Sequence, residues 1–343
     1  MRPVLYIIQY TLVIAFLFSC SNDKTDEAAQ FFLRGNVQLQ KREYREAIRY
    51  YTEAIKKKDD FADAYSNRGL AQFRNGDRKA ALADYTKAIE TDPDFEAAYF
   101  NRAEARLETG EPNGGLADLQ RIEKMYRDST FYQTRLGDAY VRLNNPSMAQ
   151  AAYDKAIRLN PKNTEALTNR GALFFNQKQY EAANADISAA LTLDPKLAEA
   201  LNNKSLILAR EGRFREALPF VERALSEQVG QPYYLNNKAY LLLMLNRPDE
   251  ALPLLRESLR RDNTNAWAHR NLGVYFLNKS KAAEALPELR QAEKLDASVD
   301  QLYFYVGQAY FATGNRAKAC EAWGRGSTAG DKLARKYRTI NCQ

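Results

Sequence analysis

Residues 62–95 read ADAYSNRGLAQFRNGDRKAALADYTKAIETDPDF, and this stretch of 34 residues decides the fold. Apolar residues recur at helical spacing over residues 61–74, and residues 78–89 read as a second helix. The letters NGD at 75–77 favour a turn between them, because Gly and Asn tolerate a positive φ. The letters TDP at 91–93 end the second helix and start the next element. The stretch therefore predicts two helices joined by a tight turn.

The same pattern returns every 34 residues. Within one unit a small residue such as Gly69 is followed twelve places later by another, Ala81, and four places after that by a large apolar residue, Tyr85. The first small residue recurs at Gly35, Gly69, Ala103, Gly137, Gly171, Ser205, Ala239, Gly273 and Gly307. One such helix pair cannot bury its apolar face alone, so neighbouring pairs must stack.

This signature resembles that of the tetratricopeptide repeat (TPR) family over residues 28–333. The resemblance implies an all-α fold, a right-handed superhelical α-solenoid of helix-turn-helix units. We expect residues 334–343 to form a capping helix. The nine expected units are 28–61, 62–95, 96–129, 130–163, 164–197, 198–231, 232–265, 266–299 and 300–333.

Two irregularities interrupt the period. In the third unit, Gly114-Gly115 weakens a helix and Ile122 occupies a place that is otherwise mostly small, so we expect a softer joint at residues 110–130. In the later units a proline recurs inside the second helix, at Pro219, Pro253 and Pro287. Either each proline kinks its helix and changes the curvature of the array, or the outer helix tolerates it without consequence.

The N-terminus predicts export. A positive start at Arg2 precedes an apolar stretch that is too short to span a membrane, and the stretch ends at Leu17-Phe18-Ser19-Cys20. This ending resembles the lipobox of bacterial lipoproteins, although Phe18 is bulkier than usual there. Residues 1–19 would then be a lipoprotein signal peptide, and residues 20–27 a lipidated Cys20 with a polar tether. A plain cleaved signal and an uncleaved anchor are the alternatives.

This N-terminus also predicts where the protein is located. The lipid would hold the chain at the bacterial cell envelope. Ser21, and not Asp, follows the lipidated position, which by resemblance to other lipoproteins fits the outer membrane. The periplasmic side and the surface side both remain open.

Two further cysteines stand near the C-terminus. If Cys20 carries lipid, Cys320 and Cys342 remain as a pair outside the cytoplasm. We favour a disulfide that pins the cap onto the last unit, with two free thiols as the alternative.

The composition predicts no catalysis. The chain has a formal net charge of +7 without a dense Lys/Arg run, which favours a solvated surface over a nucleic-acid patch. His269 is the single histidine, and no Cys or carboxylate stands at ligand spacing around it. The sequence also has no phosphate-binding Gly loop and no nucleophile motif. We therefore expect no catalytic residue, no metal, no cofactor and no nucleic-acid partner.

The family resemblance places binding in a concave groove lined by the first helices. One place in that helix carries an amide, at Asn67, Asn101, Asn169, Asn203, Asn237 and Asn271, with Leu33, Arg135 and Tyr305 in the other units. Side-chain amides both donate and accept, so a ladder of them can hold the backbone of an extended peptide. Alternatively, Asn is simply common at this place and supports the fold.

The C-terminal part of this groove is expected to be more apolar. Leu206, Tyr240 and Val274 should face it, with Tyr233, Trp267 and Arg270 nearby. Aromatic residues and Arg are typical interface anchors, so a partner peptide or helix is expected on units six to eight. The alternative is that some of these side chains pack inside the array.

Together these observations predict a non-catalytic scaffold lipoprotein. Its partner would be a protein or an extended peptide, in a secretion, outer-membrane assembly or envelope complex. Two other functions stay open: glycan or cell-wall binding, and service as an accessory subunit of an enzyme encoded elsewhere.

Overall fold

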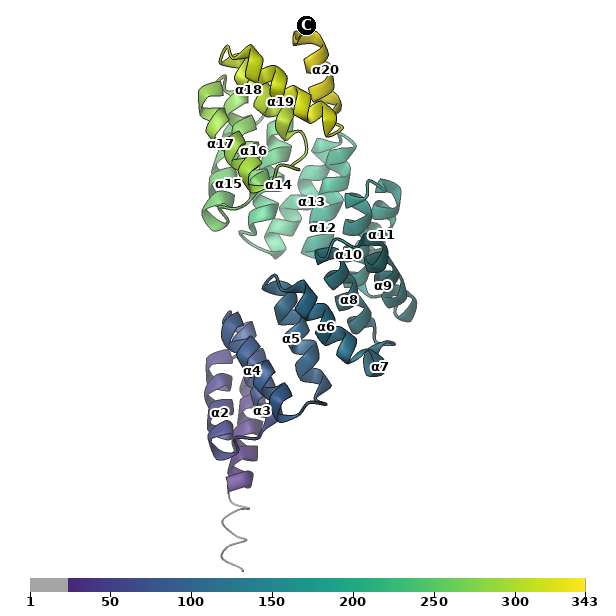
Figure 1. Cartoon of the computed structure of the whole chain (residues 1–343), viewed down its shortest axis with the longest axis vertical. Coiled ribbons are helices and arrows are strands. Elements are labelled where there is room, and N and C mark those ends of the chain that lie inside the picture. The colour runs from purple at the N-terminus through teal and green to yellow at the C-terminus, as the bar shows by residue number, and fades with distance from the viewer. Residues whose placement is uncertain (1–23, 343) are drawn as a thin grey trace, which may run out of the picture. The chain divides into compact units, whose positions relative to one another are not determined.

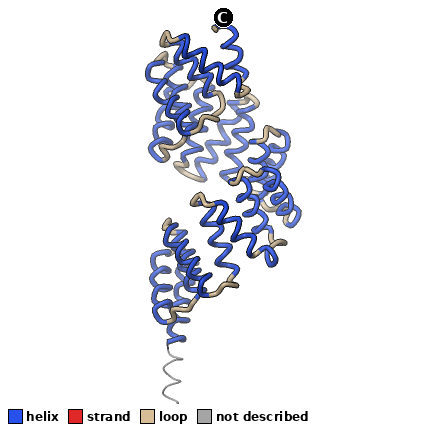
Figure 2. The backbone as a smooth tube through the Cα atoms, in the orientation of Figure 1, coloured by secondary structure: helices blue, strands red, loops and turns tan. Residues whose placement is uncertain are grey.

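The computed structural model describes residues 24–342, and every regular element in that range is a helix (Figures 1 and 2). The chain divides into two compact units, an N-terminal unit that ends at Asn163 and a C-terminal unit that begins at Thr164. The predicted signal peptide, the predicted lipid site Cys20 and the remaining residues up to 23 lie outside the described part. Within residues 24–342, no helix combines the length and the apolar run that crossing a bilayer would need.

The described part of the N-terminal unit, residues 24–163, contains four successive helical pairs. A helix over residues 24–40 packs on α2, Tyr44–Lys57. The following pairs are α3 (Ala62–Arg74) with α4 (Arg78–Thr91), α5 (Glu96–Glu108) with α6 (Pro112–Arg121), and α8 (Thr130–Arg142) with α9 (Pro146–Leu159). The short α7 (Glu123–Tyr126) follows α6.

The C-terminal unit consists of five pairs and a final helix. The pairs are α10 (Thr164–Asn176) with α11 (Tyr180–Leu193), α12 (Ala198–Arg210) with α13 (Phe214–Glu227), α14 (Pro232–Met244) with α15 (Pro248–Arg261), α16 (Ala266–Asn278) with α17 (Ala282–Leu295), and α18 (Leu302–Ala312) with α19 (Arg316–Thr328). The last helix is α20 (Lys332–Asn341). Within this unit, each first helix from α10 to α16 also contacts the first helix of the next pair. The predicted all-α fold of stacked helical pairs is thus confirmed for each unit.

The 34-residue period has a direct packing cause. Gly69 lies beneath the ring of Tyr85, and a Cβ added to this glycine would lie 2.8 Å from a ring carbon. Tyr85 is completely buried there. In the last pair Trp323 covers Gly307 in the same way. The small residue of the first helix therefore makes room for the large residue of the second helix.

The third pair breaks where the sequence is irregular. Its second helix, α6, ends at Arg121, and α7 begins after Ile122, whose ψ of 5° is not helical. Ile122 is nevertheless buried, in the cluster that also contains Leu119 and Tyr132. Ile122, a large residue where the other units mostly have a small one, is thus buried, and the helix is interrupted at this residue. The break lies inside residues 110–130, where we expected a softer joint.

The three internal prolines leave their helices continuous. Pro219, Pro253 and Pro287 lie inside α13, α15 and α17, and all three side chains are exposed. These helices run to their normal ends, because proline on the solvent side removes one hydrogen bond without disturbing the core.

Two expectations about the ends need correction. Residues 24–27, which we expect in the polar tether, belong to the first helix, where Glu27 forms an ion pair with Lys57. The capping helix, expected over residues 334–343, is α20 and begins at Lys332; its Ala334 is buried, whereas Leu333 and Ile340 are exposed. With only one neighbouring pair to contact, α20 can bury just one stripe of side chains.

Candidate functional site

The candidate site lies on the surface formed by α12, α14, α16 and α18, the successive first helices of the C-terminal unit. We call this surface the first-helix face. Most residues predicted for the groove lie on these helices. Some of them are exposed, and others join one helix to the next.

The periodic asparagines form hydrogen bonds between neighbouring repeats. In the C-terminal unit, Asn237 Nδ2 donates to Asn202 Oδ1 at 2.8 Å and Asn271 Nδ2 donates to Asn236 Oδ1 at 2.7 Å. Asn271 is 1% exposed, so its predicted contact with a peptide is wrong and the fold-supporting alternative holds for it.

The N-terminal unit uses its asparagines in a similar way. Asn67 Nδ2 donates to Asn36 Oδ1 at 2.9 Å, and Asn101 Nδ2 donates to Ser66 Oγ at 3.4 Å. Asn169 and Asn203 belong to the C-terminal unit and are partly exposed. The amide place therefore serves first to connect first helices, and only its partly exposed members could also touch a ligand.

Two aromatic side chains stand out of the first-helix face. Tyr233, in the first turn of α14, is 50% exposed, and Trp267, in the first turn of α16, is 39% exposed. They occupy the same place in consecutive repeats. Phe131, at the same place in α8 of the N-terminal unit, is also exposed. Exposed aromatic side chains of this kind are frequent anchors in protein interfaces.

Arg270 is buried among the rings of Trp267, Tyr240 and Tyr305. Only 4% of this residue, which was expected near the groove, is exposed. Its guanidinium carbon lies 5.0 Å from the ring centre of Trp267, 5.2 Å from that of Tyr240 and 5.8 Å from that of Tyr305. Cation–π attraction of this geometry offsets part of the desolvation of the charge.

The guanidinium of Arg270 makes no ion pair or hydrogen bond with any residue among 24–342, and its Nε is sealed from solvent without a partner. The two terminal nitrogens are not sealed in this way. Other largely buried arginines of the chain have carboxylates: Arg68 pairs with Asp84 at 2.7 Å and Arg102 pairs with Asp118 at 2.7 Å. Arg270 thus differs from them in lacking an anion.

The rest of the predicted apolar groove is filled by the protein itself. Val274 is 2% exposed and packs with Leu243, so the expectation that it faces a ligand is wrong. Leu206 is partly buried. Tyr240 is also partly buried and meets Phe214 edge-on, with ring centres 6.3 Å apart. The alternative that some of these side chains pack inside the array is therefore correct for Val274.

The electrostatics around Tyr305 are mixed. Burial raises the pKa of the Tyr305 phenol, the nearby charge of Arg270 opposes this shift, and Asp331 and Asp300 add to it. Asp300 is also 3.3 Å from Arg210, at the end of α12, so this ion pair joins segments three repeats apart. The sequence pattern predicted neither the contact of Tyr305 with Arg270 nor the ion pair of Arg210 with Asp300. The available signal was Tyr305 itself, which replaces the periodic asparagine.

His269 supports the packing of α16 on α17. Its Nδ1 lies 2.7 Å from Glu288 Oε2, and its Nε2 lies 3.2 Å from the carbonyl oxygen of Asn263. Burial lowers the pKa of His269, but these two partners outweigh it and the net pKa is raised. Among residues 24–342, no group of three or more His, Cys, Asp or Glu side chains could hold a metal.

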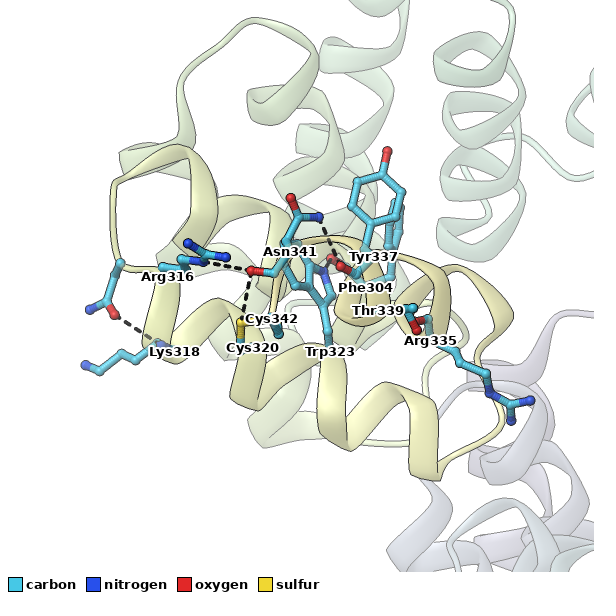
Figure 3. The surroundings of a disulfide bond; sticks show 11 residues. Phe304, Arg316, Lys318, Cys320, Trp323, Arg335, Tyr337, Thr339, Asn341 and Cys342 are labelled. Carbon is cyan, nitrogen blue, oxygen red and sulfur yellow. Dashed lines mark hydrogen bonds between the residues drawn. A yellow bond between two sulfur atoms is a disulfide. The ribbon is translucent and has the colours of Figure 1, made fainter.

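A disulfide joins the cap to the last pair (Figure 3). Cys320 of α19 and Cys342 after α20 are bonded, with their Cα atoms 5.7 Å apart. Tyr337 of the cap packs against Trp323 and Phe304, with ring centres 5.7 and 5.1 Å away. The bond therefore closes a loop around the aromatic cluster at the end of the chain.

An open cavity of about 640 Å³ lies beside this disulfide. It is lined by residues that include Tyr303, Glu321, Arg325 and Arg338. Arg325 already donates to Glu293 and to the Tyr303 hydroxyl, both at 2.5 Å. Its charge is therefore satisfied within the protein, unlike that of Arg270.

Comparisons with known proteins agree with this architecture. The family model described as tetratricopeptide repeat matches residues 32–93, 67–129, 134–198, 173–233, 202–266 and 270–332. The chain therefore belongs to the tetratricopeptide repeat family. A comparison with curated proteins found no significant match.

The solved structures that share the fold include the following two. One is the APC/C hetero-tetramer Cut9-Hcn1, with 15% identity and a TM-score of 0.66 over 92% of this chain and 76% of that chain. The other is a tetratricopeptide repeat protein from Parabacteroides merdae, with 16% identity and a TM-score of 0.55 over 72% of this chain and 98% of that chain. At such identities the likeness concerns the fold alone.

Proposed function

We propose that this protein is a non-catalytic scaffold lipoprotein that binds a protein or extended peptide on its first-helix face at the bacterial cell envelope. The chain is a TPR scaffold, a class that typically mediates protein–protein or peptide interaction. The observation that carries the proposal is the pair of exposed aromatic side chains, Tyr233 and Trp267, at one place in consecutive repeats. Nearby, the partly buried Tyr240 and the unpaired Arg270 add polar and charged chemistry.

The envelope part of the proposal rests on the sequence of the N-terminus. Lipid on Cys20 would hold the repeats close to a membrane surface, because several acyl chains bind a bilayer almost permanently. Labelling cells with a radioactive fatty acid tests this part separately. The wild-type protein should carry label and Cys20→Ala should not, and an unlabelled wild type would refute the lipid anchor.

The binding part is tested by crosslinking in the native envelope. Wild type is compared with the double variant Tyr233→Ala/Trp267→Ala, and with Phe131→Ala as a matched control at the same repeat place in the N-terminal unit. We expect one protein to be captured by wild type and by the control, and to be lost with the double variant. Capture that survives in the double variant but is lost with Phe131→Ala would move the site to the N-terminal unit.

The second candidate is glycan binding, which the flat, exposed rings of Tyr233 and Trp267 also favour. Sugar rings stack on such surfaces without needing a charged partner. Retention of the protein on isolated cell-wall glycan, unchanged after protease treatment of the glycan, would support this alternative. Loss of retention after protease treatment would return the assignment to a protein partner.

A further inference from the structure

The geometry points to a carboxylate-binding subsite at Arg270. The partner presents an Asp or Glu side chain to this guanidinium, which lies among the aromatic side chains of Trp267, Tyr240 and Tyr305. The inference rests on the proposed function and specifies the chemistry of the partner. Its starting point is a charge that the folded chain buries without an anion.

Burying the charge of Arg270 without an anion costs free energy. An arginine taken out of water normally finds a carboxylate, as Arg68 and Arg102 do in this chain. Arg270 is the one arginine among residues 24–342 in the buried class, at 4% exposed, yet the contacts of its guanidinium are with three aromatic rings and not with a carboxylate. Cation–π contacts hold the guanidinium in place but leave its N–H donors unused.

A ligand can reach the guanidinium of Arg270 only at its terminal nitrogens. Nε is the guanidinium nitrogen that is sealed off, so the terminal nitrogens are the donors still within reach of a ligand. Trp267 is exposed and Tyr240 is partly buried, and their ring centres lie 5.0 and 5.2 Å from the guanidinium carbon, so a ligand that reaches the cation from this side passes these two rings. A carboxylate entering between them would meet a planar donor pair that is already held in one orientation, which favours a strong charge-assisted contact.

The surroundings of Arg270 favour a carboxylate over a phosphate as the ligand. A guanidinium binds both groups in a bidentate manner. The negative charges of Asp331 and Asp300 add to the raised pKa of the Tyr305 phenol, after burial, which is the main cause. Their negative charge disfavours a dianionic phosphate more than a carboxylate with a single charge. Tyr233, exposed in the preceding repeat, offers an apolar contact for the neighbouring residues of the same peptide.

The test uses the full chain in detergent and two probes with blocked ends, hexaglutamate and hexaglutamine. Isothermal titration calorimetry should show hexaglutamate binding at least about tenfold more tightly than hexaglutamine. Arg270→Met should weaken hexaglutamate binding by about 10- to 100-fold, the usual loss for a hydrogen-bonded charge. The matched control is Arg260→Met, on the exposed surface of α15, and it should leave binding within about twofold.

Three outcomes would overturn the inference. Equal binding of the two probes would remove the need for charge, and equal losses in the two arginine variants would indicate a diffuse basic surface. Displacement of hexaglutamate by an equal concentration of inorganic phosphate would reassign the subsite to phosphate.

Should Arg270→Met not fold, the ¹⁵N NMR signal of the Arg270 Nε–H group in the wild type replaces it. This signal should shift with hexaglutamate and remain unchanged with hexaglutamine, and no shift with either would refute the inference. Crosslinking distinguishes a failure of the carboxylate subsite from a failure of the proposed function. A partner that Arg270→Met captures as well as wild type does, but that Tyr233→Ala/Trp267→Ala loses, would refute the carboxylate subsite alone.

Discussion

Replacing Gly307 by Ala tests the packing rule behind the 34-residue period. The new Cβ would lie 2.2 Å from Trp323 Nε1 and 2.4 Å from Trp323 Cδ1, closer than atoms can approach. Trp323 cannot easily move, because it is 1% exposed and packs against Phe311 and Tyr337, with both ring centres 5.7 Å away. Its Nε1 also donates to the carbonyl oxygen of Phe304 at 3.2 Å.

The expected cost follows from three contributions. Overpacking of a core costs about 1–3 kcal/mol, and loss of the Trp323 hydrogen bond costs about 1 kcal/mol. The helix preference for Ala over Gly returns about 1 kcal/mol. Gly307→Ala should therefore destabilise the last repeat by about 1–3 kcal/mol.

A glycine in the adjacent helix provides the control. A Cβ added to Gly324 in α19 meets its nearest atoms, in the Arg338 side chain, at 3.8 Å, which is ordinary contact. Gly324→Ala should stabilise the same repeat by up to about 1 kcal/mol.

The assay is hydrogen exchange of the α18 and α19 amides, together with urea unfolding followed by tryptophan fluorescence. Repeat arrays can unfold locally, so the exchange data decide which repeat is affected. Faster exchange confined to the last repeat in Gly307→Ala is the expected result. If Gly307→Ala proves as stable as Gly324→Ala, the packing explanation of the period is wrong.

Three further changes probe other parts of the structure. Asp118 is buried and accepts hydrogen bonds from Arg102 at 2.9 and 2.7 Å, so Asp118→Ala should lower the free energy of unfolding of its repeats by about 3–5 kcal/mol, measured by urea titration. Reducing the disulfide at the C-terminal end should destabilise the cap by about 3 kcal/mol, detected as faster exchange in α20 with the other helices unchanged. The raised pKa of His269 means that its pair with Glu288 contributes stability that is fully present below the unfolded pKa of about 6.5 and is lost as pH rises through the folded value. Glu288→Gln should thus lower the midpoint of thermal unfolding more at about pH 5.5 than at about pH 8.5, and an equal loss at both would contradict the shift.

Much of the fold could be predicted because its determinants are local. The helix pairs follow from spacing within 34 residues, and the Gly69–Tyr85 contact lies within one unit. The disturbed third pair also follows from local composition, since Ile122 occupies a small slot in its own helix. Periodic sequences of this kind specify each neighbour contact repeatedly, so one correct unit predicts the others.

The candidate site was less accessible to this reasoning. Asn237 and Asn271 share one repeat place with Asn203, yet the first two hold neighbouring helices together through Asn202 and Asn236. A sequence pattern identifies the place but does not say how much of each side chain the next repeat covers. That coverage decided that Asn271 supports the fold.

The sequence by itself determined the helical pairs, their register and the exposed aromatic place at Tyr233 and Trp267, because these depend on neighbours in the same or the next repeat. Only the tertiary structure decided that Arg270 is buried among three rings without an anion, and that Arg210 meets Asp300. The surroundings of Arg270 depend on how closely three adjacent first helices approach, whereas the Arg210–Asp300 pair depends on how far each repeat of the C-terminal unit turns relative to the last. That turn adds up over several interfaces, and no local pattern in the sequence specifies the sum.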